Sequence, residues 1–173
     1  MLEQCFLNPS KFAFPMCIET LSHAAHSQIL MKGMVDKELA IVERSTMSTV
    51  EVFASYYSPN MTTEEKQIID RFYETVSSYT PKPDLIIFLE ADTESLLQRI
   101  LHRNRPEERN VTYQFIEDIN KSYENMRHIL TDEKCVDTEL VSTKGETIDK
   151  VFSKVIPIIE RYINRSYSSS PFM

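Results

Sequence analysis

The run Asp-Leu-Ile-Ile-Phe-Leu-Glu at residues 84–90 constrains the fold of this chain more than any other segment. Its centre is entirely apolar, so an extended strand here needs other elements to cover both of its faces. Pro81 and Pro83 precede the run, and a helical pattern that starts at Asp92 follows it. A buried strand between helices is typical of a parallel sheet. The sequence therefore predicts an α/β layered fold.

Helical spacing of apolar residues recurs on both sides of this strand, and two further runs are typical of strands. We expect helices over residues 9–32, 48–57, 62–76, 92–100 and 113–130, and a last helix opened by the capping box Thr143-x-x-Glu146. Residues 39–42 (LAIV) predict a second buried parallel strand, and residues 136–141 a weaker one. Length and apolar content predict one domain over residues 1–165, with residues 166–173 as a frayed tail.

The charge and cysteine content argue against several classes of function. A formal net charge of -7 disfavours nucleic acid or an anionic membrane as a partner of the whole molecule. No apolar run reaches the roughly 18 residues that a bilayer span needs. Three cysteines without CxxC spacing indicate a reducing compartment and no structural metal. We expect a cytoplasmic protein, with a mitochondrial or nuclear location left open.

The glycine content limits how these residues can hold a nucleotide. There are two glycines, Gly33 and Gly145, and neither GxxxxGK[ST] nor GxGxxG occurs. Loops that wrap a phosphate with backbone amides need glycines, because a Cβ forbids the required conformations. The sequence therefore contains no recognisable backbone cradle for a nucleoside triphosphate.

Two charged clusters are candidates for chemistry. Glu43-Arg44 follows the predicted strand at residues 39–42, and ligands gather outside the carboxyl ends of parallel strands. The pair is either a Mg²⁺ carboxylate beside a phosphate-binding guanidinium or a strand-end salt bridge. The second cluster, LHRNRPEERN at residues 101–110, is either a helix end whose arginines complement the macrodipole or a loop whose arginines neutralise phosphate charge. The residues alone leave both pairs of alternatives open.

Four segments occur in order along the chain: Phe6-x-x-Pro-x-x-Phe-x-Phe, Glu43-Arg-Ser followed by Val-Phe-Ala, Pro83-Asp-Leu-Ile-Ile-Phe-Leu, and Arg99-x-x-x-Arg-x-Arg-Pro-Glu-Glu. Taken together, they resemble the deoxyribonucleoside kinase family, which phosphorylates deoxycytidine, deoxyguanosine, deoxyadenosine or thymidine. The resemblance covers residues 5–130. It implies transfer of a phosphoryl group from ATP to the 5'-hydroxyl of a deoxynucleoside, with ATP and Mg²⁺ as cofactors.

The resemblance implies a role for each matching residue on the phosphate side. Glu43 looks like a Mg²⁺ ligand, and Arg44 looks like a residue beside the transferred phosphate. Arg99, Arg103 and Arg105 resemble the lid arginines over the donor phosphates. Such a lid positions the phosphates and neutralises their charge, so Arg44, Arg103 and Arg105 are the expected catalytic residues.

The nucleoside side matches the family less well. Glu108 resembles the residue that accepts the sugar 3'-hydroxyl. Phe6 stands where the family has a tyrosine that contacts the sugar, and Cys17 stands where it has a glutamine that pairs with the base. A site that loses such a donor and acceptor discriminates less between bases.

The resemblance also implies missing parts. The family begins with a strand, a glycine-rich P-loop and a second strand bearing the general base, all upstream of what matches Met1. We therefore expect an incomplete P-loop-kinase-like parallel sheet with flanking helices, and a gap between residues 39–42 and residues 84–90. An activity as an enzyme stays open, because no P-loop lysine or general base is present in the matched part.

Three hypotheses follow from these matches and departures. The first is a truncated or divergent deoxynucleoside kinase of low activity, and the second is a non-catalytic scaffold or interaction protein. The third, disfavoured by the Glu43 and Phe6 segments, is a relative of the nucleoside monophosphate kinases. The family usually forms homodimers through helices equivalent to residues 10–32 and 62–79, whose apolar faces here permit the same contact.

Overall fold

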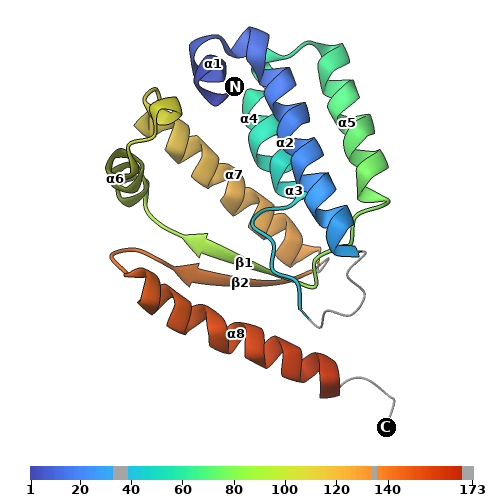
Figure 1. Cartoon of the computed structure of the whole chain (residues 1–173), viewed down its shortest axis with the longest axis vertical. Helices are drawn as coiled ribbons and strands as arrows, with labels where there is room; N and C mark the ends of the chain where they lie inside the picture. The colour runs from blue at the N-terminus through green and yellow to red at the C-terminus, as the bar shows by residue number, and fades with distance from the viewer. Residues whose placement is uncertain (33–38, 134–135, 169–173) are drawn as a thin grey trace.

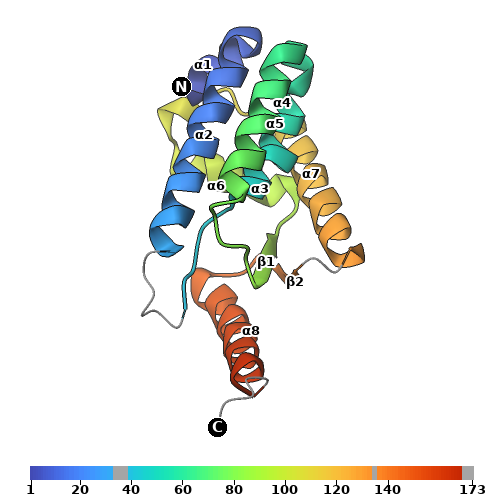
Figure 2. The ribbon, with the colours of Figure 1, turned by 90° about the vertical axis from the view of Figure 1, so that its right-hand side faces the viewer.

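Two parallel strands, β1 (Leu85–Glu90) and β2 (Asp137–Ser142), lie at the middle of the molecule. The structure is a computed structural model that describes residues 1–32, 39–133 and 136–168. Figures 1 and 2 show α8 (Ile148–Ser168) on one side of the strands and most other helices on the opposite side. The remaining helical elements are α1 (Leu2–Leu7), α2 (Pro9–Lys32), α3 (Thr46–Ser48), the π-helix η1 (Thr49–Ala54), α4 (Ser55–Tyr57), the 3-10 helix η2 (Ser58–Asn60), α5 (Thr63–Ser77), α6 (Thr93–Arg103), the 3-10 helix η3 (Pro106–Glu108) and α7 (Tyr113–Asp132).

The strand β1 forms where its apolar run predicts it. It pairs with β2 in parallel over its whole length, from Leu85 opposite Asp137 to Glu90 opposite Ser142. Alternate side chains of β1, those of Ile86 and Phe88, pack against a small core made by α7 and η1. Helix α8 contacts β2, and Figure 2 shows it beneath the strands. The predicted α/β class with a parallel sheet is confirmed.

A larger core lies within what we call the helical layer, formed by α1, α2, α4 and α5. Two of its helices begin where the sequence predicts. Helix α2 begins at Pro9 after Asn8, and a capping box opens α5. Thr62 Oγ1 accepts the Glu65 N–H at 3.2 Å, and Glu65 Oε2 accepts the Thr62 N–H at 2.8 Å. The buried members of this core are Cys5, Ala13, Met16, Cys17, Leu21, Ala25, Ala54, Tyr57, Met61, Ile69 and Val76.

The helix predicted over residues 48–57 forms with an unexpected geometry at its centre. Its first turn, α3, is capped by Ser45, whose Oγ accepts the Ser48 N–H at 3.2 Å. The chain then follows the wider π-helix η1 before α4 resumes the α-helical geometry. Val52 of η1 is fully buried and packs in one core with Met126 and Leu130 of α7. π-helical turns occur often beside functional sites, and Ser45 and α3 alone separate this one from Glu43-Arg44.

The prediction of a strand at residues 39–42 is wrong. This segment is irregular, and Leu39, Ile41 and Val42 are 48%, 72% and 39% exposed. A strand needs a neighbour that completes its backbone hydrogen bonds. Within the described ranges, β1 and β2 are the sole members of the sheet, and neither lies hydrogen-bonded to this segment. An apolar run without a partner strand therefore remains unpaired.

The capping box predicted at Thr143-x-x-Glu146 is also wrong. The hydroxyl of Thr143 donates to the carbonyl of Glu90 at 3.0 Å instead of serving the helix. Helix α8 begins at Ile148, where Thr147 Oγ1 accepts the Lys150 N–H at 3.4 Å. A tertiary hydrogen bond has thus displaced the local capping interaction.

Helix α8 continues through Ser168, and the frayed tail over residues 166–173 stays a prediction. Residues 169–173 lie outside the described residues, as do Gly33 and Cys135. A single domain over residues 1–165 stays a prediction. In the part of the chain that the structure describes, no helix has the length and apolar character needed to cross a membrane.

Candidate functional site

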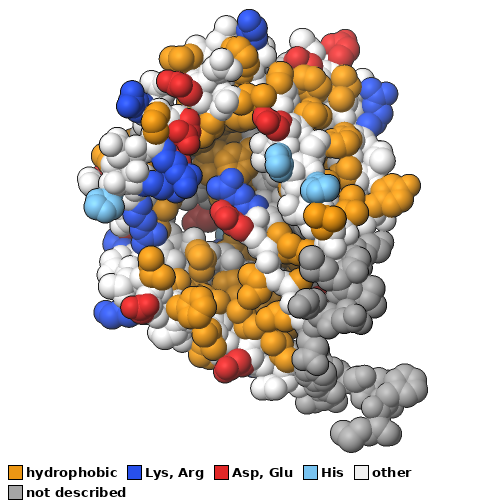
Figure 3. Space-filling model, viewed as in Figure 1, with side chains coloured by type: hydrophobic (Ala, Val, Ile, Leu, Met, Phe, Trp, Pro, Cys, Tyr) orange, Lys and Arg blue, Asp and Glu red, His pale blue; other side chains and the backbone are white. Residues whose placement is uncertain are grey.

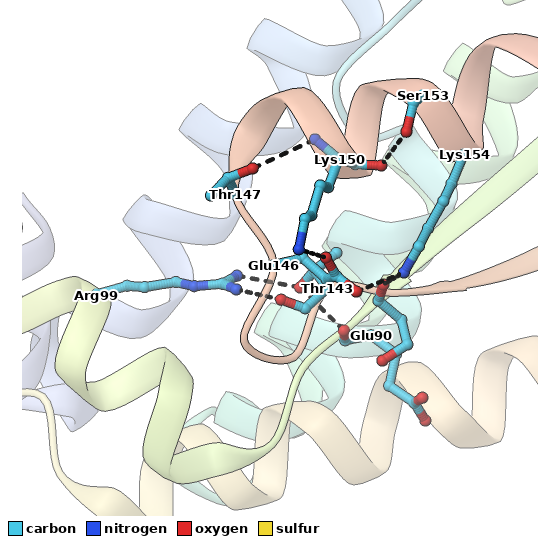
Figure 4. Close-up of polar contacts among 9 residues, drawn as sticks. Glu90, Arg99, Thr143, Glu146, Thr147, Lys150, Ser153 and Lys154 are labelled. Atoms are coloured by element: carbon cyan, nitrogen blue, oxygen red, sulfur yellow. Dashed lines mark hydrogen bonds and ion pairs between the residues drawn. The ribbon is translucent and has the colours of Figure 1, made fainter.

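The carboxyl ends of β1 and β2 carry a polar network (Figure 4). Thr143, directly after β2, donates its backbone N–H to the carbonyl of Glu90 at 2.7 Å, in addition to its hydroxyl. Arg99 of α6 donates from Nη1 to Thr143 Oγ1 at 3.1 Å and from Nη2 to Thr143 O at 2.7 Å. Thr143 is 5% exposed, and buried polar groups of this kind need their partners. The network therefore fixes α6 against the ends of both strands.

A second group of charges comes from the loop between β2 and α8 and from the first turns of α8. Glu146 Oε1 lies 3.0 Å from Lys154 Nζ, and Glu146 Oε2 lies 3.8 Å from Lys150 Nζ. The hydrogen bond from Lys154 is the main cause that lowers the pKa of Glu146. Lys154 also donates to the carbonyl of Ser142 at 3.3 Å. Gly145, at φ +65, provides the left-handed turn that brings this loop back over the strand ends.

Asp92 joins the two loops at this edge of the sheet. Its Oδ1 accepts the Ser95 N–H at 2.8 Å and caps α6. Its Oδ2 lies 3.3 Å from Lys144 Nζ in the loop after β2. The hydrogen bond from the Ser95 backbone is the largest cause that lowers the pKa of Asp92. An ionised Asp92 thus links α6 to the same loop that Arg99 holds.

The cluster LHRNRPEERN forms an internally paired loop. Arg103 donates to both carboxylate oxygens of Glu108, from Nε at 3.1 Å and from Nη2 at 2.5 Å. Arg105 Nη1 lies 4.0 Å from Glu108 Oε1. The Glu108 side chain is 11% exposed, whereas those of Arg103 and Arg105 are 47% and 55% exposed. The structure therefore brings three predicted site residues together, with the arginines at the surface and the carboxylate beneath them.

Arg99 does not join this cluster. It is placed one turn before Arg103 on α6, and both of its terminal nitrogens bind Thr143. The resemblance groups it with the lid arginines, while its geometry makes it a link between α6 and β2.

Glu43 and Arg44 leave the irregular 39–42 segment just before Ser45 caps α3. Arg44 has φ 66, a left-handed conformation that costs energy for a residue with a Cβ. Its guanidinium lies over the Phe53 ring, 5.0 Å from the centroid. Within residues 39–133, no ion pair joins Glu43 to Arg44, so the strand-end salt bridge finds no support. A strained, exposed arginine held by an aromatic ring is well placed for an anion.

Basic side chains gather around a hollow on one face of the molecule. Figure 3 shows this hollow near the centre of the face, with Lys and Arg side chains along its upper edge and hydrophobic surface below. A cavity of about 790 Å³ lies between the 39–42 segment, β1, α7 and α8, and Arg44 is among its lining residues. The predicted gap between residues 39–42 and residues 84–90 is therefore present as a cavity.

Two of the three predicted nucleoside-side residues, Phe6 and Cys17, lie in apolar surroundings. Phe6 of α1 makes an edge-to-face contact with Phe115 of α7, with ring centroids 5.0 Å apart. Cys17 of α2 is buried in the core of the helical layer. Burial, followed by the effect of nearby Cys5, raises the pKa of the Cys17 thiol to about 12. Helix α1, which carries Phe6, also contacts η3, which carries Glu108.

A metal site with three or more protein ligands is not found among the described residues. Glu43 is the one predicted metal ligand, and it is exposed. Mg²⁺ commonly binds one or two carboxylates and completes its shell with waters and substrate phosphates. A single carboxylate beside Arg44 is compatible with that mode.

A sequence model described as deoxynucleoside kinase matches residues 1–164. The chain belongs to the deoxynucleoside kinase family. A curated relative, the deoxyadenosine kinase of Dictyostelium discoideum, is 27% identical over 129 residues, which are 70% of this chain and 49% of that protein. The chain of this family member thus spans about half the length of the curated relative.

Solved structures of a deoxyadenosine kinase from M. mycoides share the fold of this deoxynucleoside kinase family member. The structure with the products dCMP and a flexible dCDP has a TM-score of 0.75 at 20% identity, covering 92% of this chain and 80% of that one. The structure with dCTP has a TM-score of 0.73 at 18% identity and covers 92% and 79%. The structure with dATP has a TM-score of 0.72 at 21% identity and covers 91% and 79%. The expected incomplete P-loop-kinase-like fold is thereby confirmed.

Sequence reasoning missed the polar network at the strand ends of this deoxynucleoside kinase relative. Arg99 and Thr143 lie 44 residues apart, and Thr143 and Glu90 lie 53 apart. No local spacing connects such residues. The one available signal was their position, because both Glu90 and Thr143 adjoin the carboxyl ends of predicted parallel strands.

Proposed function

We propose that this chain forms the lid-bearing part of a deoxynucleoside kinase, which phosphorylates the 5'-hydroxyl of a deoxynucleoside with ATP. The observation that supports it best is the cluster of Arg103, Arg105 and Glu108 on a loop that follows β1 and α6. Arginines that meet the donor phosphates supply the charge neutralisation on which phosphoryl transfer mainly depends. Residues 1–173 alone are expected to be of low activity, since their sequence has no GxxxxGK[ST].

The ion pairs within the lid are compatible with this role. A carboxylate has about four lone-pair sites, so Glu108 can accept a sugar hydroxyl while it still holds Arg103. Arg105, 4.0 Å from that carboxylate and exposed, can turn toward a phosphate at small cost. Glu108 therefore orients both arginines and offers an acceptor to the sugar. Arg44, stacked on Phe53, is the second source of positive charge.

ATP and Mg²⁺ are the proposed cofactors. Glu43 would contribute one carboxylate oxygen to Mg²⁺, with the phosphates and water providing the other ligands. Bound Mg²⁺ supplies neutralisation of phosphate charge. Arg44, Arg103 and Arg105 would hold the phosphates, and the Arg99 link to Thr143 keeps α6 in position to present the lid. The deoxynucleoside and ATP are the proposed small-molecule partners.

Nucleotide binding by the purified chain tests this proposal. Isothermal titration with ATP and Mg²⁺ should detect binding to the unchanged chain, and Arg105→Ala should weaken it by roughly tenfold, the effect of one lost charge-assisted contact. Arg109→Ala is the matched control, because Arg109 lies on the same loop outside the Glu108 ion pairs, and its affinity should stay within twofold. Turnover with deoxyadenosine, deoxyguanosine, deoxycytidine and thymidine should be at or near background.

Two outcomes would contradict parts of the proposal. Equal losses in Arg105→Ala and Arg109→Ala would mean that general positive charge, and not the lid, attracts the nucleotide. Rapid phosphorylation by residues 1–173 alone would overturn the expectation of low activity.

A non-catalytic scaffold is the second candidate function. Phe6 and Cys17 favour it, because both pack against apolar side chains of the helical layer. A folded chain that binds neither ATP nor a deoxynucleoside in the same titration would support the scaffold. A cytoplasmic location is proposed for either function.

A homodimer through α2 and α5 is also proposed for either function. Ile29, Leu30 and Ile68 are exposed on those helices and could form the contact. Sedimentation velocity tests the dimer.

A further inference from the structure

Arg44 lies at one end of a row of three side chains. Its guanidinium is over the Phe53 ring, 5.0 Å from the centroid. The Phe53 ring in turn meets the Tyr123 ring edge to face, with centroids 6.3 Å apart and planes at 84°. We call this row, which joins the segment before α3 to η1 and α7, the Arg44 stack. It holds the side chain of a residue whose φ of 66 is itself strained.

Tyr123 attaches the stack to a buried core. Its ring and that of Phe53 pack against the buried side chains of Val52, Met126 and Leu130. Burial is the largest cause that raises the pKa of the Tyr123 hydroxyl, while the charge of Arg44 acts to lower that pKa and the charge of Glu43 to raise it. Tyr123 is thus a neutral side chain within electrostatic reach of both members of the Glu43-Arg44 pair.

The π-helix η1 accounts for the direction of Phe53. A π-helix closes its hydrogen bonds between residues five apart, so each turn holds more residues than an α-helical turn. Adjacent residues are therefore separated by a smaller rotation, and three in succession avoid the solvent. Val52 and Ala54 are buried, and Phe53 between them is half-buried. The wide turn thus directs Phe53 toward α7 while both neighbours keep their burial.

The stack leaves the binding groups of Arg44 available. Arg44 and Tyr123 both line the cavity of about 790 Å³. A guanidinium that stacks uses its flat face, and its N–H donors lie in the plane, where they can bind a phosphate. Stacking on Phe53 and binding of an anion are therefore compatible.

We propose that Tyr123 is a positioning residue, which holds Phe53 and, through it, the Arg44 guanidinium in the orientation that binds the transferred phosphate. The role of Arg44 at the phosphate rests on the proposed function, whereas the stack does not. An arginine that is already fixed loses less conformational freedom when its ligand binds. The ring of Tyr123 is needed for this role, and its hydroxyl is not.

NMR of arginine side chains in the unliganded chain tests the stack. An aromatic face shifts the resonances of protons that lie over it, so the side-chain protons of Arg44 should differ from those of the exposed Arg109. Tyr123→Leu removes the ring and should move the Arg44 resonances toward those of Arg109. Tyr123→Phe keeps the ring and should preserve them. Tyr123→Met, which fills more of the space, replaces Tyr123→Leu if circular dichroism shows that the latter is unfolded.

Leu130→Ala is the matched control for a loss of packing. Leu130 lies on the same helix and in the same core as Tyr123, but it does not line the cavity. The variant should lower stability toward urea and leave the Arg44 resonances unchanged. Equal changes in Leu130→Ala and Tyr123→Leu would overturn the proposal in favour of a general packing effect. Unchanged Arg44 resonances in Tyr123→Leu would overturn it as well.

Isothermal titration with ATP and Mg²⁺ tests the positioning role. Tyr123→Leu should weaken binding by roughly threefold to tenfold, because a guanidinium that is not held is competent for only part of the time. Arg44→Ala should weaken it at least as much. Tyr123→Leu added to Arg44→Ala should cause no further loss, since Tyr123 acts through Arg44.

Two results of this titration would contradict the positioning role. A further loss in the double variant would mean that Tyr123 contacts the nucleotide itself or supports the fold in general. Absence of ATP binding by the unchanged chain would overturn the proposed function and the positioning role with it. The NMR comparison would in that case still show whether Tyr123 holds Arg44, so the two failures are distinct.

Discussion

The helical layer and the sheet layer, which comprises β1, β2 and α8, differ in how far each is complete. Leu21 and Cys5 of the helical layer are fully buried. Every residue of β1 is half-buried or exposed, and α8 leaves Ile148 and Phe152 84% and 61% exposed. A helix satisfies its backbone internally, whereas a strand depends on neighbours. The helical layer therefore buries its apolar side chains more fully than the sheet layer does.

Removal of a large side chain should have its greatest effect in the helical layer. Leu21→Ala should lower the free energy of unfolding by about 3 kcal/mol, because a fully buried leucine leaves a cavity that its neighbours fill only in part. Ile159→Ala, in the open wall of the sheet layer, should cost about 1 kcal/mol, since water already reaches that wall. Urea unfolding of both variants measures the difference. Equal losses would show that the two layers are equally packed.

The link between α6 and the strand ends should have a smaller effect. Thr143→Val keeps the backbone contacts and removes the hydroxyl that binds Glu90 and Arg99. We expect a loss of about 1 to 2 kcal/mol, the usual cost of a broken buried hydrogen bond. Thr143→Ser keeps the hydroxyl and should lose clearly less in the same urea experiment. Faster amide exchange in β1 of the valine variant alone would confirm that the link stabilises the sheet layer.

The same contrast explains which elements the sequence could predict. Asn8-Pro9, the Thr62 capping box and the apolar run of β1 are local signals, and each gives the predicted element. Residues 39–42 have a strand-like composition, but a strand depends on a partner that local composition does not contain. The Thr143 capping box failed for a related reason, because Glu90, 53 residues away, binds its hydroxyl.

The residues of the candidate site also differ in whether local or tertiary contacts determine their positions. Arg103, Arg105 and Glu108 are close in sequence, and the structure keeps them in contact. Arg99 is equally close in sequence, yet it binds Thr143 across the sheet end. Cys17 is a residue whose burial follows from the packing of whole helices. Local spacing therefore keeps Arg103, Arg105 and Glu108 together, while a tertiary contact separates Arg99 from them.

The smallest expected effect concerns acid sensitivity at the open side of the sheet layer. Lys154 lowers the pKa of Glu146 below its ordinary value of 4.5. A carboxyl whose folded-state pKa is depressed stabilises the protein above its unfolded-state pKa, and that contribution is lost as the pH falls through the folded-state value.

Lys154→Met should therefore return the pKa of Glu146 toward 4.5. The variant should also lack the stability that the unchanged chain gains from this ion pair at neutral pH and loses in acid. Lys150→Met, which removes the weaker contact at 3.8 Å, should shift it less. Carboxyl carbon shifts of Glu146, followed by NMR from pH 7 to pH 2.5, measure both changes. Solvent can screen this ion pair, because the side chains of Lys154 and Glu146 are 43% and 25% exposed. A pKa of Glu146 that is the same in Lys154→Met and in the unchanged chain would show that this screening is complete.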